Sequence, residues 1–457
     1  MADVIEVMRA AVGNDKVVGG DAVKDDLCHD EALGIEPVTP ACAVFPESVS
    51  DVVAVLETAG AGHIPVTARG SGTGLSGAAI PHPDGVLVSF ERMNTIIEID
   101  VENLVAVVQP GVTLDQLDEA LVPLGLVYPV FPGEYSASLG GNVATNAGGM
   151  RAVKYGVTRH QVLGLQAVLA TGEVIRTGGR FVKGSTGYDL TQLIVGSEGT
   201  LAVVTEATLH LYPRLAHQGT VLAPFTTLAA VTDAVPKIVA SGIAPMIVEY
   251  IDLMTMAAMV DNLGLELGVP EDVKQTALAY LVVQLEQSDE RRLEEDVAQL
   301  AEHVLALGAI DAYVLPENAA AHLIAAREKA FFLAKGAGAD DIVDVVVPRG
   351  SIADFMAGVG ELAAQQGALV AGCGHAGDGN VHLSVFQPDD TAREELMRSL
   401  FAHGLALGGA ISGEHGLGRT KKKYFLELED PAKVALLRRI KAAFDPDGIL
   451  NPGAVFD

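Results

Sequence analysis

The sequence predicts an α+β protein in at least two parts, because the pattern of predicted strands, helices and glycine clusters changes near Pro213. From about Pro37 to Pro213, short β-rich runs and a few helices hold most of the dense glycine clusters. After Pro213, strand-like and helical stretches alternate, which is typical of a sheet backed by helices. At roughly 150 residues per domain, 457 residues suggest two or three domains with large buried cores.

The composition excludes several classes of protein. The chain has 59 Asp+Glu against 30 Lys+Arg, a net charge of −29, which argues against nucleic acid because phosphates need clustered basic residues. With 49% hydrophobic residues, it is not a disordered acidic chain. Its 50 glycines exceed the ordinary share of roughly 7%, which points to sharp turns and to backbone that approaches a ligand.

Cysteine use and hydropathy predict a soluble, cytoplasmic protein. Three widely separated cysteines form neither a disulfide framework nor a C-x-x-C motif, which favours a reducing compartment. The first ten residues carry acids and no signal-peptide pattern. No apolar run approaches the roughly 20 residues that a membrane span needs.

The elements of the first part follow from periodicity and turn residues. Residues 1–36 are expected to form a helical entry segment. Further helices are predicted over Val52–Ala59 and Leu114–Leu121, and strands over Ile64–Thr67, Val86–Ser89 and Val105–Val108. The pair Thr171-Gly172 predicts a hairpin turn between strands at Val162–Ala170 and Glu173–Arg176.

The second part has its own pattern. Strands are predicted over Met246–Ile251, Ala277–Leu285, Ile310–Leu315 and Ile342–Val347. Apolar residues at three-to-four spacing predict an amphipathic helix over Arg291–Leu307. The chain becomes glycine-rich again from about Gly409, and a helix is predicted over Pro431–Phe444.

The first glycine cluster matches a dinucleotide fingerprint but lacks its context. Gly72, Gly74 and Gly77 satisfy G-x-G-x-x-G, which needs a helix directly afterwards. Pro81 and Pro83 make that helix unfavourable, so a Rossmann fold is rejected. The loop is then either a mobile turn or an anion nest of successive N–H groups.

Two more glycine clusters favour a ligand. Residues 132–149 contain five glycines with small polar neighbours, and Gly196-Ser197-Glu198-Gly199 lies between two strand patterns. Three separated loops of this kind in one domain suit a long ligand that meets backbone along its whole length.

A histidine cluster lies in the second part. Asp378-Gly379 can reverse the chain between two strand-like segments and bring His375 and His382 together. These two histidines alone could be ordinary hydrogen-bonded turn residues. With Glu414-His415 in a second glycine loop, two histidines and a carboxylate also make a common set of divalent-metal ligands.

These motifs together resemble the vanillyl-alcohol-oxidase superfamily of flavoproteins, and within it the D-2-hydroxyacid dehydrogenase branch that includes D-lactate dehydrogenase and the glycolate oxidase D-subunit. The resemblance extends from about residue 37 to Asp457 and includes residues 183–190 and 444–453. It implies a two-part FAD-binding domain and an α+β substrate or cap domain of antiparallel sheet plus helices. The boundaries expected are an N-terminal helical segment at 1–36, an FAD-binding domain at 37–216, a substrate domain at 217–410 and a C-terminal segment at 411–457 that returns to the flavin site.

The resemblance implies a set of FAD contacts, and the absence of an obvious histidine for a covalent link favours non-covalent FAD. The cofactor-binding residues implied are Arg69, Gly70, Ser71, Gly72, Thr73, Gly74, Leu75, Ser76, Pro132, Gly133, Gly140, Gly141, Thr145, Asn146, Gly148, Gly156, Glu198, Gly199, Val204 and Asn451.

It also implies the chemistry. His375, His382 and Glu414 would bind a divalent metal, Zn or Mn, that lowers the pKa of the substrate hydroxyl. His415 would be the base that removes the hydroxyl proton as hydride passes from Cα to flavin N5. Arg327 would pair with the substrate carboxylate, although a solvated helix arginine is the alternative, and Arg349 is a weaker candidate.

Departures from the branch bear on the substrate. Relatives that oxidise 2-hydroxyglutarate have Asn where this chain has Ser384 and Lys where it has Ile342, so a second cation for a distal carboxylate is missing. A small anionic D-2-hydroxyacid, D-lactate or glycolate, is therefore favoured. The alternatives are a D-2-hydroxyglutarate dehydrogenase, a flavin-binding non-redox enzyme and an electron-transfer subunit.

The expected partners beyond the substrate are an unidentified electron acceptor and a second copy of the chain in a homodimer. Arg419-Thr420-Lys421-Lys422-Lys423 is a basic run in an acidic chain. Such a run is either a solvated helix face or a positive surface that attracts an anionic substrate or docks the acceptor.

Overall fold

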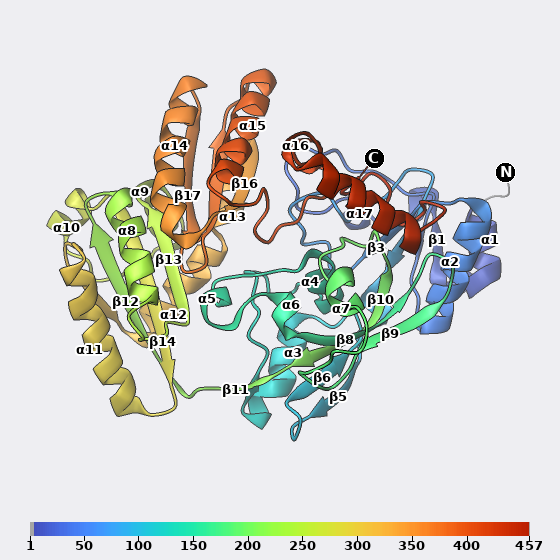
Figure 1. Cartoon of the computed structure of the whole chain (residues 1–457), viewed down its shortest axis with the longest axis horizontal. Coiled ribbons are helices and arrows are strands. Elements are labelled where there is room, and N and C mark those ends of the chain that lie inside the picture. Colours follow the sequence, from blue (N-terminus) through green and yellow to red (C-terminus); the bar gives the residue numbers. More distant parts are fainter. Residues whose placement is uncertain (1–3, 457) are drawn as a thin grey trace. The chain divides into compact units, whose positions relative to one another are not determined.

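The computed structural model describes residues 4–456, and the chain forms two compact units (Figure 1). Unit 1 comprises residues up to Ala147, Val157–Arg214 and the segment from Glu414 onward, and unit 2 comprises Gly148–Gly156 and Leu215–Gly413. The chain therefore crosses from unit 2 to unit 1 between Gly413 and Glu414.

Unit 1 contains a four-stranded sheet in the order β1-β2-β4-β3. Its strands are β1 (Val17–Gly19), β2 (Cys42–Val44), β3 (Val66–Arg69) and β4 (Val86–Ser89), and β2, β4 and β3 run parallel. Helices α1 (Val4–Val12) and α2 (Val49–Gly62) contribute to its core. The C-terminal segment joins the same core, because Leu450 bridges to Val66.

The second sheet of unit 1 is antiparallel, in the order β5-β6-β10-β8-β9. Its strands are β5 (Ile96–Asp100), β6 (Val105–Val108), β8 (Val162–Val168), β9 (Val174–Gly178) and β10 (Val203–His210). A small pair, β7 (Leu126–Val127) and β11 (Tyr212–Pro213), lies apart. The helices of this region are α3 (Leu114–Leu121), α4 (Leu139–Thr145), α6 (Thr158–Gln161), α7 (Leu190–Ile194), α16 (Lys422–Leu428) and α17 (Pro431–Phe444).

Unit 2 is built on a seven-stranded antiparallel sheet in the order β15-β12-β14-β13-β17-β18-β16. The strands are β12 (His217–Phe225), β13 (Ile247–Asp252), β14 (Ala279–Gln287), β15 (Tyr313–Leu315), β16 (Asp341–Val346), β17 (Leu369–His375) and β18 (Asn380–Phe386). The helices are α5 (Ala152–Tyr155), α8 (Leu228–Val239), α9 (Leu253–Leu263), α10 (Glu271–Thr276), α11 (Glu290–Ala306), α12 (Glu317–Glu328), α13 (Ala330–Gly336), α14 (Ile352–Gln365) and α15 (Asp390–Ala406).

One face of this sheet supports the histidine cluster. Ile251 and Cys373 lie on that face and pack with Leu323 and Ala326 of α12. Because side chains two residues apart share a face, Glu249 on β13 and His375 on β17 also belong to it. The helix α12 thus holds the residues that follow Ala326 close to this part of the sheet.

The predicted α+β fold class is confirmed, and many elements occur where the sequence predicted them. β4, β6, α3 and α17 have the predicted bounds, and the hairpin at Thr171-Gly172 joins β8 to β9, with Gly172 at a φ of 85°. Residues 70–85 contain no helix, in agreement with the rejection of a Rossmann motif. Residues 4–36 contain a single α-helix, and β1 adds this segment to the first sheet.

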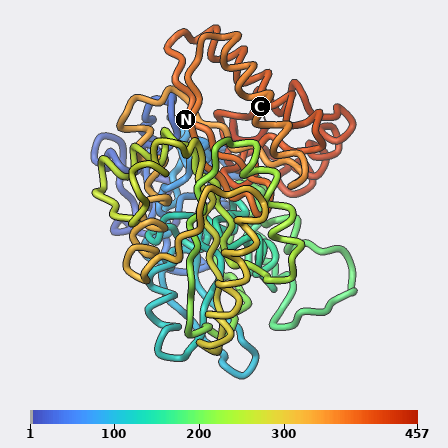
Figure 2. The backbone as a smooth tube through the Cα atoms, turned by 90° about the vertical axis from the view of Figure 1, so that its left-hand side faces the viewer, coloured from blue at the N-terminus to red at the C-terminus, as the bar shows by residue number. Residues whose placement is uncertain are grey.

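Residues 183–189 of the motif lie in a long loop of unit 1 between β9 and α7, which Figure 2 shows as a green loop extending from the tube, and Leu190 begins α7. Every residue from Phe181 to Leu190 is exposed, and Tyr188 is 96% exposed.

The turn between β17 and β18 should tolerate no side chain at its glycine. Gly379 has a φ of 96°, and a Cβ there would lie 2.0 Å from the carbonyl oxygen of Val347. We expect Gly379→Ala to reduce the free energy of unfolding by about 2 kcal/mol or more, from backbone strain and this clash. The matched control is Gly360→Ala in α14, where a Cβ meets no atom within 4 Å and should stabilise the helix by about 0.5–1 kcal/mol. Equal midpoints for both variants in urea unfolding would contradict the prediction.

Candidate active site

The β17–β18 hairpin brings His375 and His382 together in unit 2. Its register pairs Cys373 with His382 and His375 with Asn380, so both imidazoles project from the same face. Their ring centroids are 4.8 Å apart with planes at 78°, and both residues are largely buried. Two imidazoles in this relation can present nitrogens to one ion.

Each histidine has a buried carboxylate beside it. Glu249 on β13 accepts a hydrogen bond from Nδ1 of His375 at 2.6 Å, and its Oε2 lies 2.8 Å from Nε of Arg327. Glu249 is fully buried, while Arg327 is 7% exposed. Arg327 is therefore a buried, ion-paired residue, which excludes the solvated helix arginine as its explanation.

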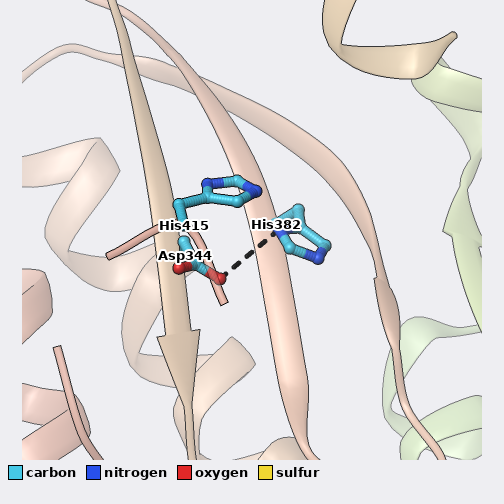
Figure 3. Close-up of side chains that lie close together, drawn as sticks. All are labelled: Asp344, His382 and His415. Carbon is cyan, nitrogen blue, oxygen red and sulfur yellow. Dashed lines mark ion pairs between the residues drawn. The ribbon is translucent and has the colours of Figure 1, made fainter. Parts of the chain in front are cut away.

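The second carboxylate is Asp344 on β16, which has no exposed surface. Its Oδ1 accepts a hydrogen bond from Nδ2 of Asn380 at 2.9 Å and lies 3.7 Å from Nδ1 of His382. Its Oδ2 accepts hydrogen bonds from the hydroxyl of Ser412 at 2.6 Å and from the N–H of Gly413 at 3.1 Å. Figure 3 shows Asp344 and His382 with their ion pair dashed, and labels His415.

Asp344 also binds Gly413, the last residue of unit 2. The N–H of Gly413 donates to the backbone carbonyl of Asp344 at 2.8 Å as well as to its side chain. Glu414 is the next residue, and consecutive Cα atoms are about 3.8 Å apart. Glu414 and His415, which are assigned to unit 1, are therefore the first two residues after the one that is bonded to Asp344.

In unit 1, two buried side chains hold the loop that carries His415. The hydroxyl of Ser76 donates to the carbonyl oxygens of His415 and Gly416, both at 3.0 Å. The carboxylate of Glu198 accepts from the N–H groups of Leu417 at 2.8 Å and Gly418 at 2.7 Å. Burial raises the pKa of Glu198, and these two donors partly oppose that shift.

The loop after β3 presents unpaired backbone donors. Among the described residues, the N–H groups of Gly72, Thr73, Gly74 and Leu75 have no acceptor, whereas that of Ser71 donates to Ser138. Successive N–H groups of this kind fit a phosphate. The guanidinium of Arg69 instead donates to the carbonyl oxygens of Asp26 and His29, so in this structure it holds the loop to the N-terminal segment.

The other residues predicted to bind the cofactor are distributed over both units. Glycines 70, 140 and 141 pack closely around Ser138 and Pro110, which leaves no room for larger side chains at 70 and 140. Asn451 lies at a φ of 45°, and its Nδ2 donates to the carbonyl oxygens of Ala78 and Glu198. Val204 is a residue of β10 and belongs to the hydrophobic core. The rest are in unit 1, at Pro132, Gly133, Thr145, Asn146 and Gly199, or in unit 2, at Gly148 and Gly156.

Two basic candidates have structural partners. Nε of Arg349 donates to the carbonyl oxygen of Gly377 at 2.7 Å and so supports the histidine turn. In the basic run, Arg419 donates to the carbonyl of Ile80, and Lys421 is only 2% exposed. A solvated face therefore describes only the end of that run, where Lys422 is half-buried and Lys423 is exposed.

Two family profiles match most of the chain. Residues 40–178 match "FAD binding domain", and residues 214–455 match "FAD linked oxidases, C-terminal domain". The chain belongs to the FAD-linked oxidases. The predicted membership of the vanillyl-alcohol-oxidase superfamily is confirmed, and FAD is the cofactor of this family's binding domain.

Relatives support an FAD-linked oxidoreductase of the D-2-hydroxyacid dehydrogenase branch. The chain is 57% identical over 445 residues to an uncharacterized FAD-linked oxidoreductase of Mycobacterium tuberculosis, covering 97% of each. It is 39% identical to a D-lactate dehydrogenase of Archaeoglobus fulgidus, covering 90% of each. It is 37% identical to glycolate oxidase subunit GlcD of Bacillus subtilis, covering 91% of this chain and 89% of that protein.

Solved structures agree on the fold. The 4-ethylphenol oxidase of Gulosibacter chungangensis superposes with a TM-score of 0.81 at 20% identity, covering 100% of this chain and 97% of that one. At this level of identity the similarity shows the fold alone. In the described part of the oxidoreductase, no helix combines the length and apolar character required to cross a membrane.

The residues of unit 1 fit FAD. Besides the unpaired N–H groups at Gly72–Leu75, the buried Oδ1 of Asn451 and Nδ2 of Asn142 have no partner among the described residues. Buried polar atoms without partners are costly in a protein alone, whereas FAD carries both phosphates and a polar ring system. The donor set thus agrees with the family match.

Sequence reasoning missed Glu249 and Asp344. Both belong to predicted strands, at Met246–Ile251 and Ile342–Val347, where an acid stands alone among apolar residues. An acid in a buried strand must find donors, because an isolated buried charge is expensive. That signal could have identified both residues.

Replacing Glu198 should destabilise unit 1. In Glu198→Gln, one of the two acceptor oxygens becomes an NH₂ group that faces a backbone donor, so we expect a loss of about 1–3 kcal/mol in the free energy of unfolding. The matched control is Glu206→Gln, whose ion pair with Arg176 lies at the surface, where a loss below about 1 kcal/mol is expected. Urea unfolding of the FAD-loaded protein measures both, and equal losses would contradict the role of Glu198.

Proposed function

We propose that this FAD-linked oxidoreductase oxidises a small D-2-hydroxyacid, D-lactate or glycolate, to the 2-oxoacid. The observation that supports it most strongly is the set of buried groups on one sheet face of unit 2. There, His375, His382 and Arg327 lie together, and Gly413 leads directly from Asp344 into Glu414 and His415. These groups can bind a carboxylate and a hydroxyl and remove a proton.

His375, His382 and Glu414 are proposed as the ligands of a divalent metal, Zn or Mn. Nδ1 of His375 already faces Glu249, which directs Nε2 of the same ring toward an ion, and two imidazoles with a carboxylate suit these metals. When bound, the metal would lower the pKa of the substrate hydroxyl.

His415 is proposed as the base. Its backbone is held by Ser76, a residue of the loop with the unpaired donors, and the following two N–H groups are held by Glu198. The imidazole is therefore attached to a rigid loop within the flavin-binding unit. A general base needs such support, because it must be held within hydrogen-bond reach of the proton that it removes. Bound FAD supplies the hydride acceptor, N5 of the flavin, and is proposed to be non-covalent.

Arg327 is proposed to bind the substrate carboxylate. Its guanidinium is planar and offers several N–H donors, of which Nε faces Glu249. Burial strengthens such a contact because water does not compete with it.

The size of the substrate is inferred from two facing residues. Ile342 on β16 pairs directly with Ser384 on β18, and each lies two residues from the Asp344–His382 pair on the same face. Neither side chain can neutralise a second carboxylate. This favours a monocarboxylate over 2-hydroxyglutarate.

We propose that electrons then pass to an acceptor outside this chain, since its three cysteines give no iron–sulfur motif. We also propose that the protein is soluble, that it is cytoplasmic and that it forms a homodimer.

Anaerobic reduction of the flavin tests the proposal. Purified holoprotein should lose its yellow absorbance with D-lactate or glycolate, and the L-lactate enantiomer should react far more slowly. His415→Ala should retain FAD but reduce the flavin about 10²–10⁴ times more slowly, because the base is lost. The control His403→Ala, in α15, should react like the wild type. Failure to bleach with a panel of D-2-hydroxyacids plus Zn²⁺ or Mn²⁺ would refute the function, and full activity of His415→Ala would refute the base.

Substrate preference should change with the facing pair. In Ile342→Lys combined with Ser384→Asn, a cation and an amide would meet a distal carboxylate, so we expect kcat/KM for D-2-hydroxyglutarate relative to D-lactate to rise by about tenfold or more. The control is Ile342→Met with Ser384→Ala, which changes shape without adding charge. An unchanged ratio in the first variant would place the distal end of the substrate elsewhere.

A further inference from the structure

We propose that Glu249 is a positioning residue that sets the proposed metal ligand His375 and the proposed substrate-binding Arg327 in one fixed relation. The inference rests on the proposed function and adds a residue that neither the sequence motifs nor the comparisons assign. Glu249 itself need not touch substrate, metal or flavin.

The geometry places Glu249 between two elements. Tyr250 pairs with Gly374 across β13 and β17, so the same register places Glu249 beside His375. One carboxylate oxygen, Oε1, lies 2.6 Å from Nδ1 of His375, and the other, Oε2, lies 2.8 Å from Nε of Arg327 on α12. Each oxygen therefore serves a different partner.

The contact with His375 determines which ring nitrogen can bind a metal. A carboxylate only accepts, so the Nδ1 that faces it must carry the proton, and the lone pair is then on Nε2. Carboxylates in this position orient metal-binding histidines and raise their basicity. Glu249 thus selects the tautomer that the proposed site needs.

The contact with Arg327 positions the group that is proposed to bind the substrate carboxylate. Long arginine side chains lose rotamer freedom when they bind, and a partner that holds Nε in advance reduces that loss. Glu249 lies on a central strand of the sheet and contacts both Arg327 and His375. The distance between the guanidinium that would bind the substrate carboxylate and the imidazole that would bind the metal is therefore set before the substrate arrives.

A buried ion pair that serves only stability would also explain Glu249. Removing one partner of such a pair is destabilising whatever its function, so stability cannot separate the two roles. Affinity for a metal can separate the two roles, because replacing a residue that serves only stability would not selectively weaken metal binding.

The experiment measures Zn²⁺ affinity of the chelator-stripped FAD protein by competition with a coloured chelator. Glu249→Gln should weaken Zn²⁺ binding about 10- to 100-fold, the usual effect of losing such a partner, and should raise KM for D-lactate. Glu249→Asp is the second variant, since it keeps the charge beside Arg327 but withdraws the carboxylate by one methylene, and the same direction is expected. The control is Asp252→Asn on the same strand, which accepts from the N–H groups of Thr255 and Gly372 and should leave Zn²⁺ affinity unchanged.

Each outcome is decisive. Weaker Zn²⁺ binding in a folded Glu249 variant, with the control unchanged, supports the role. Wild-type affinity in either folded variant, or an equal loss in Asp252→Asn, overturns it while the proposed function stands. If the wild type binds neither Zn²⁺ nor Mn²⁺, the proposed metal site fails and this inference fails with it.

Discussion

The arrangement of the candidate site depends on one constraint, which is that a carboxylate removed from water must collect donors. Glu249 and Asp344 have no exposed surface, and Glu198 is 6% exposed. An unpaired charge in such a position would cost several kcal/mol. Each acid therefore draws donors from segments that are distant in sequence, and those segments carry the groups proposed to do the chemistry.

Each unit has its own buried acids, and these acids position different groups of the candidate site. Glu249 and Asp344 organise the histidines and Arg327 within unit 2, while Glu198 with Ser76 organises the His415 loop within unit 1. The chain passes between these systems at Gly413, whose N–H is fixed on Asp344. Gly413 is followed by Glu414 and then by His415, the residue proposed to take the proton.

Local sequence patterns predicted most of the helices and strands. They could not predict which residues donate hydrogen bonds to the buried acids. The apolar run Ile342–Val347 predicts a strand, and Asp378-Gly379 predicts the turn that aligns His375 with His382. The pairing of β13 with β17 joins residues more than 100 positions apart, and nothing local encodes it. Glu198 shows the same limit, because the N–H groups of Leu417 and Gly418, from which its side chain accepts, lie 219 and 220 positions further along the chain.

The excess of glycine has a related physical cause at the His415 loop. Gly416 has a φ of 80°, and a Cβ there would lie 2.9 Å from the carboxyl carbon of Glu198. Gly418 has a φ of 47°, and a Cβ there would lie 2.0 Å from the carbonyl oxygen of Ser76. Glycine at 416 therefore leaves room for the buried Glu198 carboxylate, and glycine at 418 leaves room for the carbonyl group of Ser76. In this loop, glycine therefore provides rigidity through close contact rather than flexibility.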